Sequence, residues 1–123
     1  MKSLFIQFFS KKSLFCINLL LLFTVSAFAA DYETTYLEYR KTIIAYELCK
    51  NQTFGQEQTY VLAKYIERQI NNALSPVQKL SLNDQAKNKM KDMVVQWGCT
   101  SPKISAYISR FEQELRPVLK ANQ

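Results

Sequence analysis

Residues 93–99, with the sequence MVVQWGC, predict the end of a helix that is covalently joined to another helix end. Gly98 suits such an end because glycine readily adopts the positive φ of a C-terminal helix stop. Cys99 has one plausible partner, Cys49, which lies 50 residues earlier. A pair of cysteines in a small chain that leaves the cytoplasm indicates a structural disulfide. We therefore expect a Cys49–Cys99 bond, with Trp97 in the core beside it, under the loop that follows the first helix.

Export is predicted by the first 29 residues. A start with three lysines and no acid (residues 1–12) precedes an apolar run (residues 14–25) and the small-residue pattern Ala27-Phe28-Ala29. This is the order of a secretory signal peptide. The sequence predicts cleavage between Ala29 and Ala30, which leaves residues 30–123 as a single domain.

The alternative is that residues 13–30 remain as an uncleaved membrane anchor. The stretch is 18 residues long and contains Asn18, Thr24 and Ser26, whereas a bilayer core requires about 20 predominantly apolar residues. Cleavage would remove Cys16 and three lysines, so that two cysteines remain and the net charge falls from +6 to +3. We expect a periplasmic or secreted protein, and a charge of +3 argues against a nucleic-acid partner.

The rest of the chain predicts an all-α fold, a small up-down four-helix bundle closed by one disulfide. We expect helices over residues 31–50, 56–73 and 81–97, and a fourth that begins at Pro102 and ends or kinks at Pro117. In such a bundle the C-terminal ends of the first and third helices lie at the same pole, where Cys49 and Cys99 can meet.

Between the second and third helices the apolar phase changes. Val77 and Leu80 lie nearly opposite the later apolar stripe when the wheel is continued. We interpret this as a short extra helical turn over residues 76–80, capped by Ser75 with Gln78 as its box partner, and a fresh helix capped by Ser81. A similar capping box is expected from Thr53 and Gln56.

Apolar positions at helical spacing predict the core. The first helix has two strips, with Arg40 and Glu47 between them. The tyrosines of the larger strip are interpreted as core residues, the alternative being an aromatic binding surface. The predicted core residues are Tyr32, Tyr36, Tyr39, Ile43 and Tyr46; Leu37, Ile44 and Leu48; Val61, Leu62, Tyr65, Ile66, Ile70 and Ala73; Leu82, Ala86, Met90, Met93 and Trp97; and Ile104, Ile108, Phe111 and Leu115.

Few residues suggest chemistry. The chain has no histidine, which removes the commonest general base and metal ligand. Met90 and Met93 share a helix face and have the thioethers that copper(I) accepts, but methionine at stripe positions is typical of a core. We predict no metal, no cofactor and no catalytic residue. Were the protein an enzyme, its acids would come from Glu33, Glu47 and Glu57, which nothing in the sequence pairs.

A basic run, Lys87, Lys89 and Lys91, is interpreted as a solvated helix face. Its functional alternative is contact with anionic lipid head groups through Lys87 and Lys91, which point away from the apolar stripe. Membrane contact would thus require this face or an uncleaved signal.

In size, export, helical content and a cysteine pair 50 residues apart, the chain resembles the small periplasmic acid-stress chaperones. The resemblance concerns the layout, and no functional residue carries over from it. Those chaperones open at low pH and expose apolar surface, so the resemblance implies a holdase as one alternative. Our expectation is a non-enzymatic exported protein that acts through contacts with an unknown protein partner. A membrane-surface protein is the other alternative.

Overall fold

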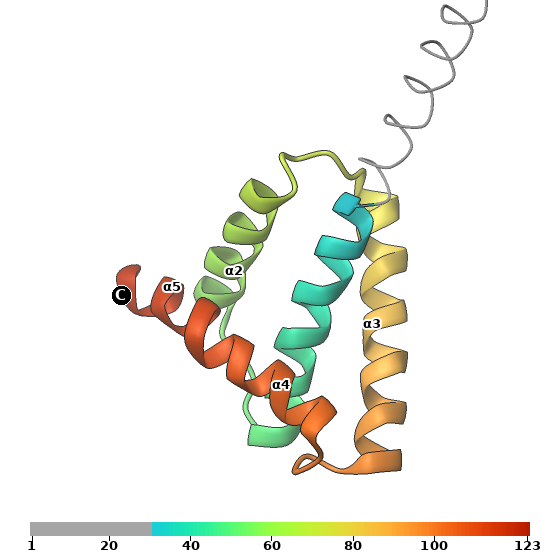
Figure 1. Ribbon diagram of the computed structural model, residues 1–123. Helices are drawn as coiled ribbons and strands as arrows, with labels where there is room; N and C mark the ends of the chain where they lie inside the picture. Colours follow the sequence, from blue (N-terminus) through green and yellow to red (C-terminus); the bar gives the residue numbers. More distant parts are fainter. Residues whose placement is uncertain (1–30) are drawn as a thin grey trace, which may run out of the picture. The chain divides into compact units, whose positions relative to one another are not determined.

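The computed structural model describes residues 31–123, and within this range the chain forms helices and turns without a strand (Figure 1). The predicted signal peptide, its cleavage point between Ala29 and Ala30, and Cys16 lie outside the described residues. Across residues 31–123, no helix is both long and apolar enough to cross a membrane. The all-α prediction is confirmed for the described part.

The first helix covers residues 31–50, as predicted. It is followed by α2 (Gln56–Gln69) and α3 (Pro76–Trp97). The chain then continues through α4 (Pro102–Arg110), a π-helical segment η1 (Phe111–Leu115) and α5 (Arg116–Ala121). We call residues 102–121, from α4 to α5, the C-terminal helix.

The second helix ends four residues earlier than predicted. Asn71 and Asn72 adopt φ values of 54° and 52°, in the left-handed region that stops a helix. Asparagine tolerates this region better than most residues because its short polar side chain bonds locally. At the other end of α2, the Gly55 amide donates to the Gln58 side-chain oxygen at 3.1 Å, so the predicted Thr53 cap is wrong.

The predicted break within the third helix is also wrong. Residues 76–97 form one continuous helix, in which Ser81 is an internal residue. The capping box is confirmed, because Ser75 Oγ accepts from the Gln78 amide at 3.2 Å while Gln78 Oε1 accepts from the Ser75 amide at 2.9 Å. The phase change has another cause: Val77 and Leu80 point into solvent, with 78% and 64% of their surfaces exposed.

Pro117 neither ends the C-terminal helix nor leaves it regular. The turn before it widens into η1, where the Arg116 amide donates to the Phe111 carbonyl, five residues back. A proline inside an α-helix lacks an amide hydrogen and clashes with the preceding turn. The wider turn relieves both problems, and the helix continues to Ala121.

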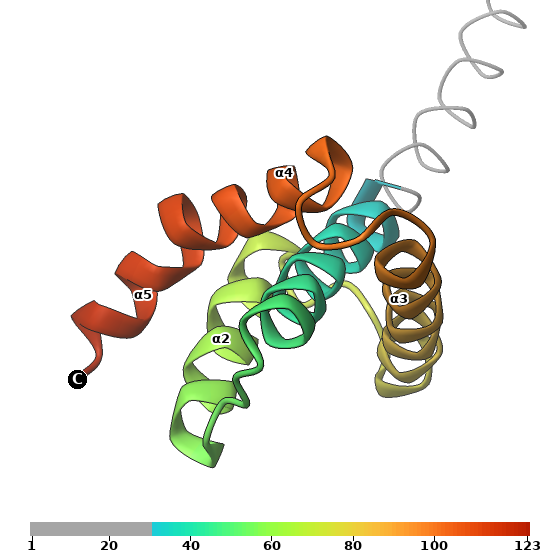
Figure 2. The same ribbon diagram turned by 90° about the horizontal axis from the view of Figure 1, so that it is seen from below.

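The first helix lies between α2 and α3 in both views, and the C-terminal helix crosses it obliquely on one side (Figures 1 and 2). The first three helices alternate in direction. The crossing of the fourth leaves the regular up-down bundle unconfirmed. The core falls into three clusters, two of them large. One joins the first helix to α2 and the C-terminal helix; another joins it to α3 and α4. The main members are Tyr39, Tyr46, Leu62, Ile66, Phe111 and Leu115, and Ile44, Ala86, Met90, Met93 and Ile104.

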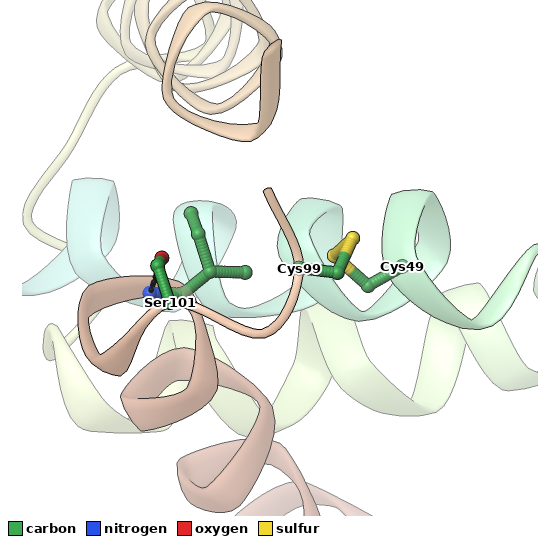
Figure 3. The surroundings of a disulfide bond; sticks show 4 residues. Cys49, Cys99 and Ser101 are labelled. Carbon is green, nitrogen blue, oxygen red and sulfur yellow. Dashed lines mark hydrogen bonds between the residues drawn. A yellow bond between two sulfur atoms is a disulfide. The ribbon is translucent and has the colours of Figure 1, made fainter. Parts of the chain in front are cut away.

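The Cys49–Cys99 disulfide is present and joins the end of the first helix to the segment just after α3 (Figure 3). The two Cα atoms lie 5.6 Å apart. Ser101 follows within two residues and caps α4, since its Oγ accepts from the Ile104 amide at 3.4 Å. The disulfide therefore fixes the point at which the chain turns from α3 into the C-terminal helix.

Trp97 does not lie in the core, contrary to the prediction. Its side chain is 40% exposed, and Lys103 Nζ lies 4.2 Å from its ring centroid. Leu48, also predicted to be buried, is equally exposed. Both residues lie in the last turn of their helices. The apolar stripe reaches this turn, but the neighbouring helices do not cover it there.

Gly98→Ala is expected to lower the free energy of unfolding by about 1–3 kcal/mol, because Gly98 has φ 76° and ψ 163°, a region that only glycine occupies easily. A Cβ at this position would meet no atom within 4 Å, so the loss would come from backbone strain alone. The matched control is Gly55→Ala, which meets no atom either and has φ −66°. Urea unfolding of both variants checks this; equal losses would refute the strain account.

Candidate functional site

The most distinctive surface feature is a groove between α2 and α3, with the first helix as its floor. Its cavity volume is about 380 Å³. We call it the α2–α3 groove. It is lined by Tyr36 and Arg40 from the first helix, by Ala63, Ile66 and Glu67 from α2, and by Pro76, Lys79, Leu80 and Asn83 from α3.

The groove exists because the first helix is covered on only three sides. Tyr39 and Tyr46 pack against α2 and the C-terminal helix, while Ile44 packs against α3 and α4. The strip that contains Tyr36, Arg40 and Glu47 faces away from the C-terminal helix, as the helical spacing of these residues requires. In Figure 2 this is the side of the first helix opposite α4 and α5.

The rims of the groove are apolar and exposed. Leu80 lies on the α3 rim, and Val77 is one turn earlier on the outer shoulder of the same helix. Tyr60, which is 61% exposed, follows the spacing of Ala63 and Glu67 along α2 and so lies on the same face. Exposed apolar residues that gather beside a concavity are typical of binding surfaces.

Two polar contacts join the walls and the floor of the groove. Lys79 Nζ lies 2.6 Å from Glu67 Oε1 and joins α3 to α2. Arg40 Nε donates to Asn83 Oδ1 at 2.7 Å and joins the floor to α3. Arg40 takes part in none of the ion pairs found among residues 31–123. Its charge does lower the pKa of Glu47, which lies seven residues later in the first helix.

Burial also shifts the pKa of two groups on this strip of the first helix, Glu47 and Tyr36. Burial raises the pKa of Glu47 above its usual value, although the charges of Arg40 and Lys87 and a hydrogen bond from the Phe54 backbone oppose this. Burial likewise raises the pKa of the Tyr36 hydroxyl, against the effects of Arg40 and Lys79. Arg40 is a half-buried cation in the partly apolar α2–α3 groove, where the attraction between its charge and an added carboxylate would be stronger than in water.

On the opposite side of the first helix, a carboxylate already contacts tyrosine hydroxyls and an arginine. Glu114 of the C-terminal helix accepts hydrogen bonds from Tyr39, from Tyr65 at 3.1 Å and from Arg110 at 3.1 Å. Burial alone would raise the pKa of Glu114, but these three hydrogen bonds outweigh it and hold that pKa below the usual range. A carboxylate among apolar side chains therefore locks the C-terminal helix onto the first helix.

The Glu114 lock predicts a specific acid sensitivity. Because the pKa of Glu114 is lower in the folded chain than in the unfolded chain, its contribution to stability is complete above about pH 4.5 and is lost as the pH falls through the folded value. Glu47, whose pKa is raised, acts in the opposite direction. We expect Glu114→Gln to reduce stability at pH 7 and to flatten its decline below pH 4.5. Thermal unfolding between pH 3 and pH 7 checks this. Glu57→Gln, at an exposed carboxylate of α2, should leave the decline unchanged; a parallel decline in Glu114→Gln would contradict the assignment.

The residues considered from the sequence for chemistry lie apart. Met90 and Met93 are buried in the cluster between the first helix, α3 and α4, where they pack as core residues. Glu33 is exposed and accepts from Gln78 Nε2 at 3.3 Å, while Glu57 is exposed on α2 and Glu47 is half-buried on the first helix. The structure does not bring these three acids together. Lys87, Lys89 and Lys91 are all exposed on α3.

The groove itself was not predicted from the sequence. Two of its signals were visible, namely the phase change at Val77 and Leu80 and the polar strip of Arg40 and Glu47 between two apolar strips. A phase change was interpreted as a break in the helix, whereas it reports that a helix exposes apolar residues on a second face. No model of a known protein family matches the chain, and no curated protein or solved structure matches it significantly.

Proposed function

We propose that this chain is a small exported, non-enzymatic helical protein that acts by binding another protein, and that the α2–α3 groove is its binding surface. The observation that supports this most strongly is the exposure of Leu80 and Val77 beside a groove whose floor carries Arg40. Apolar residues that are exposed together beside a concavity are typical of an interaction surface, whereas one exposed singly, such as Val95, is not. The disulfide is compatible with export, since such bonds persist in oxidising compartments.

The proposal is tested by comparing two charge insertions on the same helix. Leu80→Glu places a carboxylate on the groove rim, and Val95→Glu places one at an exposed apolar position that does not line the groove. Tagged wild-type and variant proteins are recovered from the native envelope, and the proteins retained with each are quantified. We expect a discrete set of proteins to be lost with Leu80→Glu and kept with Val95→Glu. Equal recovery with both variants would contradict the proposal.

A chaperone-like holdase is the second candidate, and the Glu114 lock is the observation that favours it. Protonation of Glu114 at low pH removes the negative charge that strengthens three hydrogen bonds holding the C-terminal helix. Loss of this helix would expose the apolar side chains of Phe111 and Leu115. The holdase predicts apolar-dye binding and suppression of client aggregation that rise together as the pH falls. Glu114→Gln, which lacks the charge at every pH, should raise both at neutral pH and make both less dependent on pH. Groove-dependent partner binding at neutral pH, without these effects, would favour the first proposal.

A further inference from the structure

We propose that the α2–α3 groove accepts a single amphipathic helix of a partner protein, and that this helix carries a carboxylate that pairs with Arg40. The inference rests on the protein-binding role proposed above and names the kind of ligand. It is drawn from the way in which the chain's own C-terminal helix binds the other side of the first helix.

The C-terminal helix defines what the first helix accepts as a neighbour. It presents an apolar ladder, Ile104, Phe111, Leu115 and Leu119, and it places one acid, Glu114, within that ladder. The receiving surface supplies tyrosine hydroxyls from Tyr39 and Tyr65, and Arg110 completes the set of donors to the carboxylate. An apolar helix face that carries one acid is therefore a combination that the fold already accommodates. The second acid of this helix, Glu112, is exposed and pairs with Arg116.

The groove has a tyrosine and an arginine that could contact a carboxylate in the same way. Its floor has a tyrosine and an arginine, Tyr36 and Arg40, four residues apart on one helix face. Its walls supply the exposed apolar side chains of Ala63 and Leu80. A helix laid between two helices, on top of a third, is a frequent mode of peptide recognition, with anchors spaced three or four residues apart.

The charges that face the groove favour an acidic occupant. Among the residues that line the groove, the cations are Arg40 and Lys79 and the anion is Glu67, while Glu47 and Lys87 lie outside the lining. Lys79 and Glu67 neutralise each other in an ion pair. Arg40 is hydrogen-bonded only to the neutral Asn83 side chain among the contacts of residues 31–123, whereas Arg110 and Arg116 each contact a carboxylate. A bidentate carboxylate is the natural remaining partner of such a guanidinium.

The probe for this inference is a synthetic peptide of residues 102–121, with Pro117→Ala to make a regular helix. It carries the apolar ladder and Glu114. A second peptide carries Glu114→Gln in addition. Binding to the purified, disulfide-bonded protein is measured by fluorescence anisotropy against wild type, Arg40→Gln and Lys103→Gln. Lys103→Gln is the matched control because it removes one positive charge far from the groove, above the Trp97 ring.

The expected result is a coupling between Arg40 and the peptide carboxylate. We expect the Glu114→Gln peptide to bind wild type and Lys103→Gln roughly three- to tenfold more weakly than the peptide that keeps Glu114. Arg40→Gln should bind the two peptides about equally well. Leu80→Glu should weaken both peptides roughly tenfold or more, while Val95→Glu should leave both unchanged. Circular dichroism confirms that each variant is folded.

Several outcomes would overturn the inference. Binding that is insensitive to both Leu80→Glu and Arg40→Gln would show that the peptide merely displaces the native C-terminal helix. No binding up to millimolar peptide would show that the groove does not accept this class of helix. If wild type is a dimer that Leu80→Glu dissociates, the groove binds a second copy of this chain. If wild type binds phosphatidylglycerol vesicles and Leu80→Glu does not, the groove binds a lipid surface. The first two outcomes leave the capture experiment above intact, so failure of the helix mode and failure of protein binding are distinguishable.

Discussion

Loss of the Cys49–Cys99 disulfide is expected to lower the free energy of unfolding by about 4 kcal/mol, the chain-entropy value for a closed loop of roughly 50 residues. For a domain of this size, that corresponds to a drop of roughly 15–30 °C in melting temperature. The bond anchors the turn from α3 into the C-terminal helix, so its loss releases the start of that helix in particular. Thermal unfolding with and without reductant measures the effect.

Variants separate the disulfide from the side chains that form it. Cys49→Ala and Cys99→Ala should each reproduce the loss caused by reduction, and the double variant should be no less stable than either single variant. Additive losses in the double variant would mean that the two side chains contribute separately, through packing. Titration that finds two free thiols in the native protein would remove the covalent link from the account.

Phe111→Ala is expected to lower the free energy of unfolding by roughly 3–5 kcal/mol, the range for an aromatic side chain removed from a core. Phe111 is 1% exposed, and its ring stacks on Tyr46 with 4.0 Å between centroids and on Phe54 with 5.4 Å. It therefore joins the C-terminal helix to the first helix and to the loop that follows it. Urea unfolding monitored by circular dichroism measures the loss.

Two control variants accompany Phe111→Ala. Phe111→Leu keeps most of the side-chain volume and should cost less than about 1.5 kcal/mol. Val95→Ala, at a side chain that is 88% exposed, should change stability by no more than about 0.5 kcal/mol. A small loss in Phe111→Ala, similar to that of Val95→Ala, would show that the C-terminal helix is held mainly by its polar contacts with Tyr39, Tyr65 and Tyr46.

Local signals in the sequence predicted the all-α fold, the capping box of α3, the start of α4 at Pro102, the positive φ of Gly98 and the disulfide. Each of these depends on a few neighbouring residues or on a single possible pairing. The two apolar strips of the first helix were predicted to be core. Residues such as Tyr39 and Ile44 are buried as expected, by different neighbours.

The errors share a physical origin, because each depends on neighbours that the sequence does not specify. Trp97 continues the stripe of α3, but nothing covers the last turn. Val77 and Leu80 are apolar and exposed, so their phase misled the assignment of the helix. Pro117 permits either an end or a widened turn, and the packing of Phe111 and Leu115 favours the second. The groove combines residues from three helices, and the C-terminal helix lies on the opposite side of the first helix (Figure 2).

The central claim is that the α2–α3 groove is the surface through which this protein contacts another protein. The most direct measurement places a photo-crosslinking amino acid at Leu80 in the intact native envelope and compares it with the same amino acid at Val95. Both positions are exposed on α3, but Val95 lies outside the groove. The account predicts a discrete adduct with another protein from position 80 and none from position 95. Absence of an adduct at position 80, or equal adducts at both positions, would contradict it.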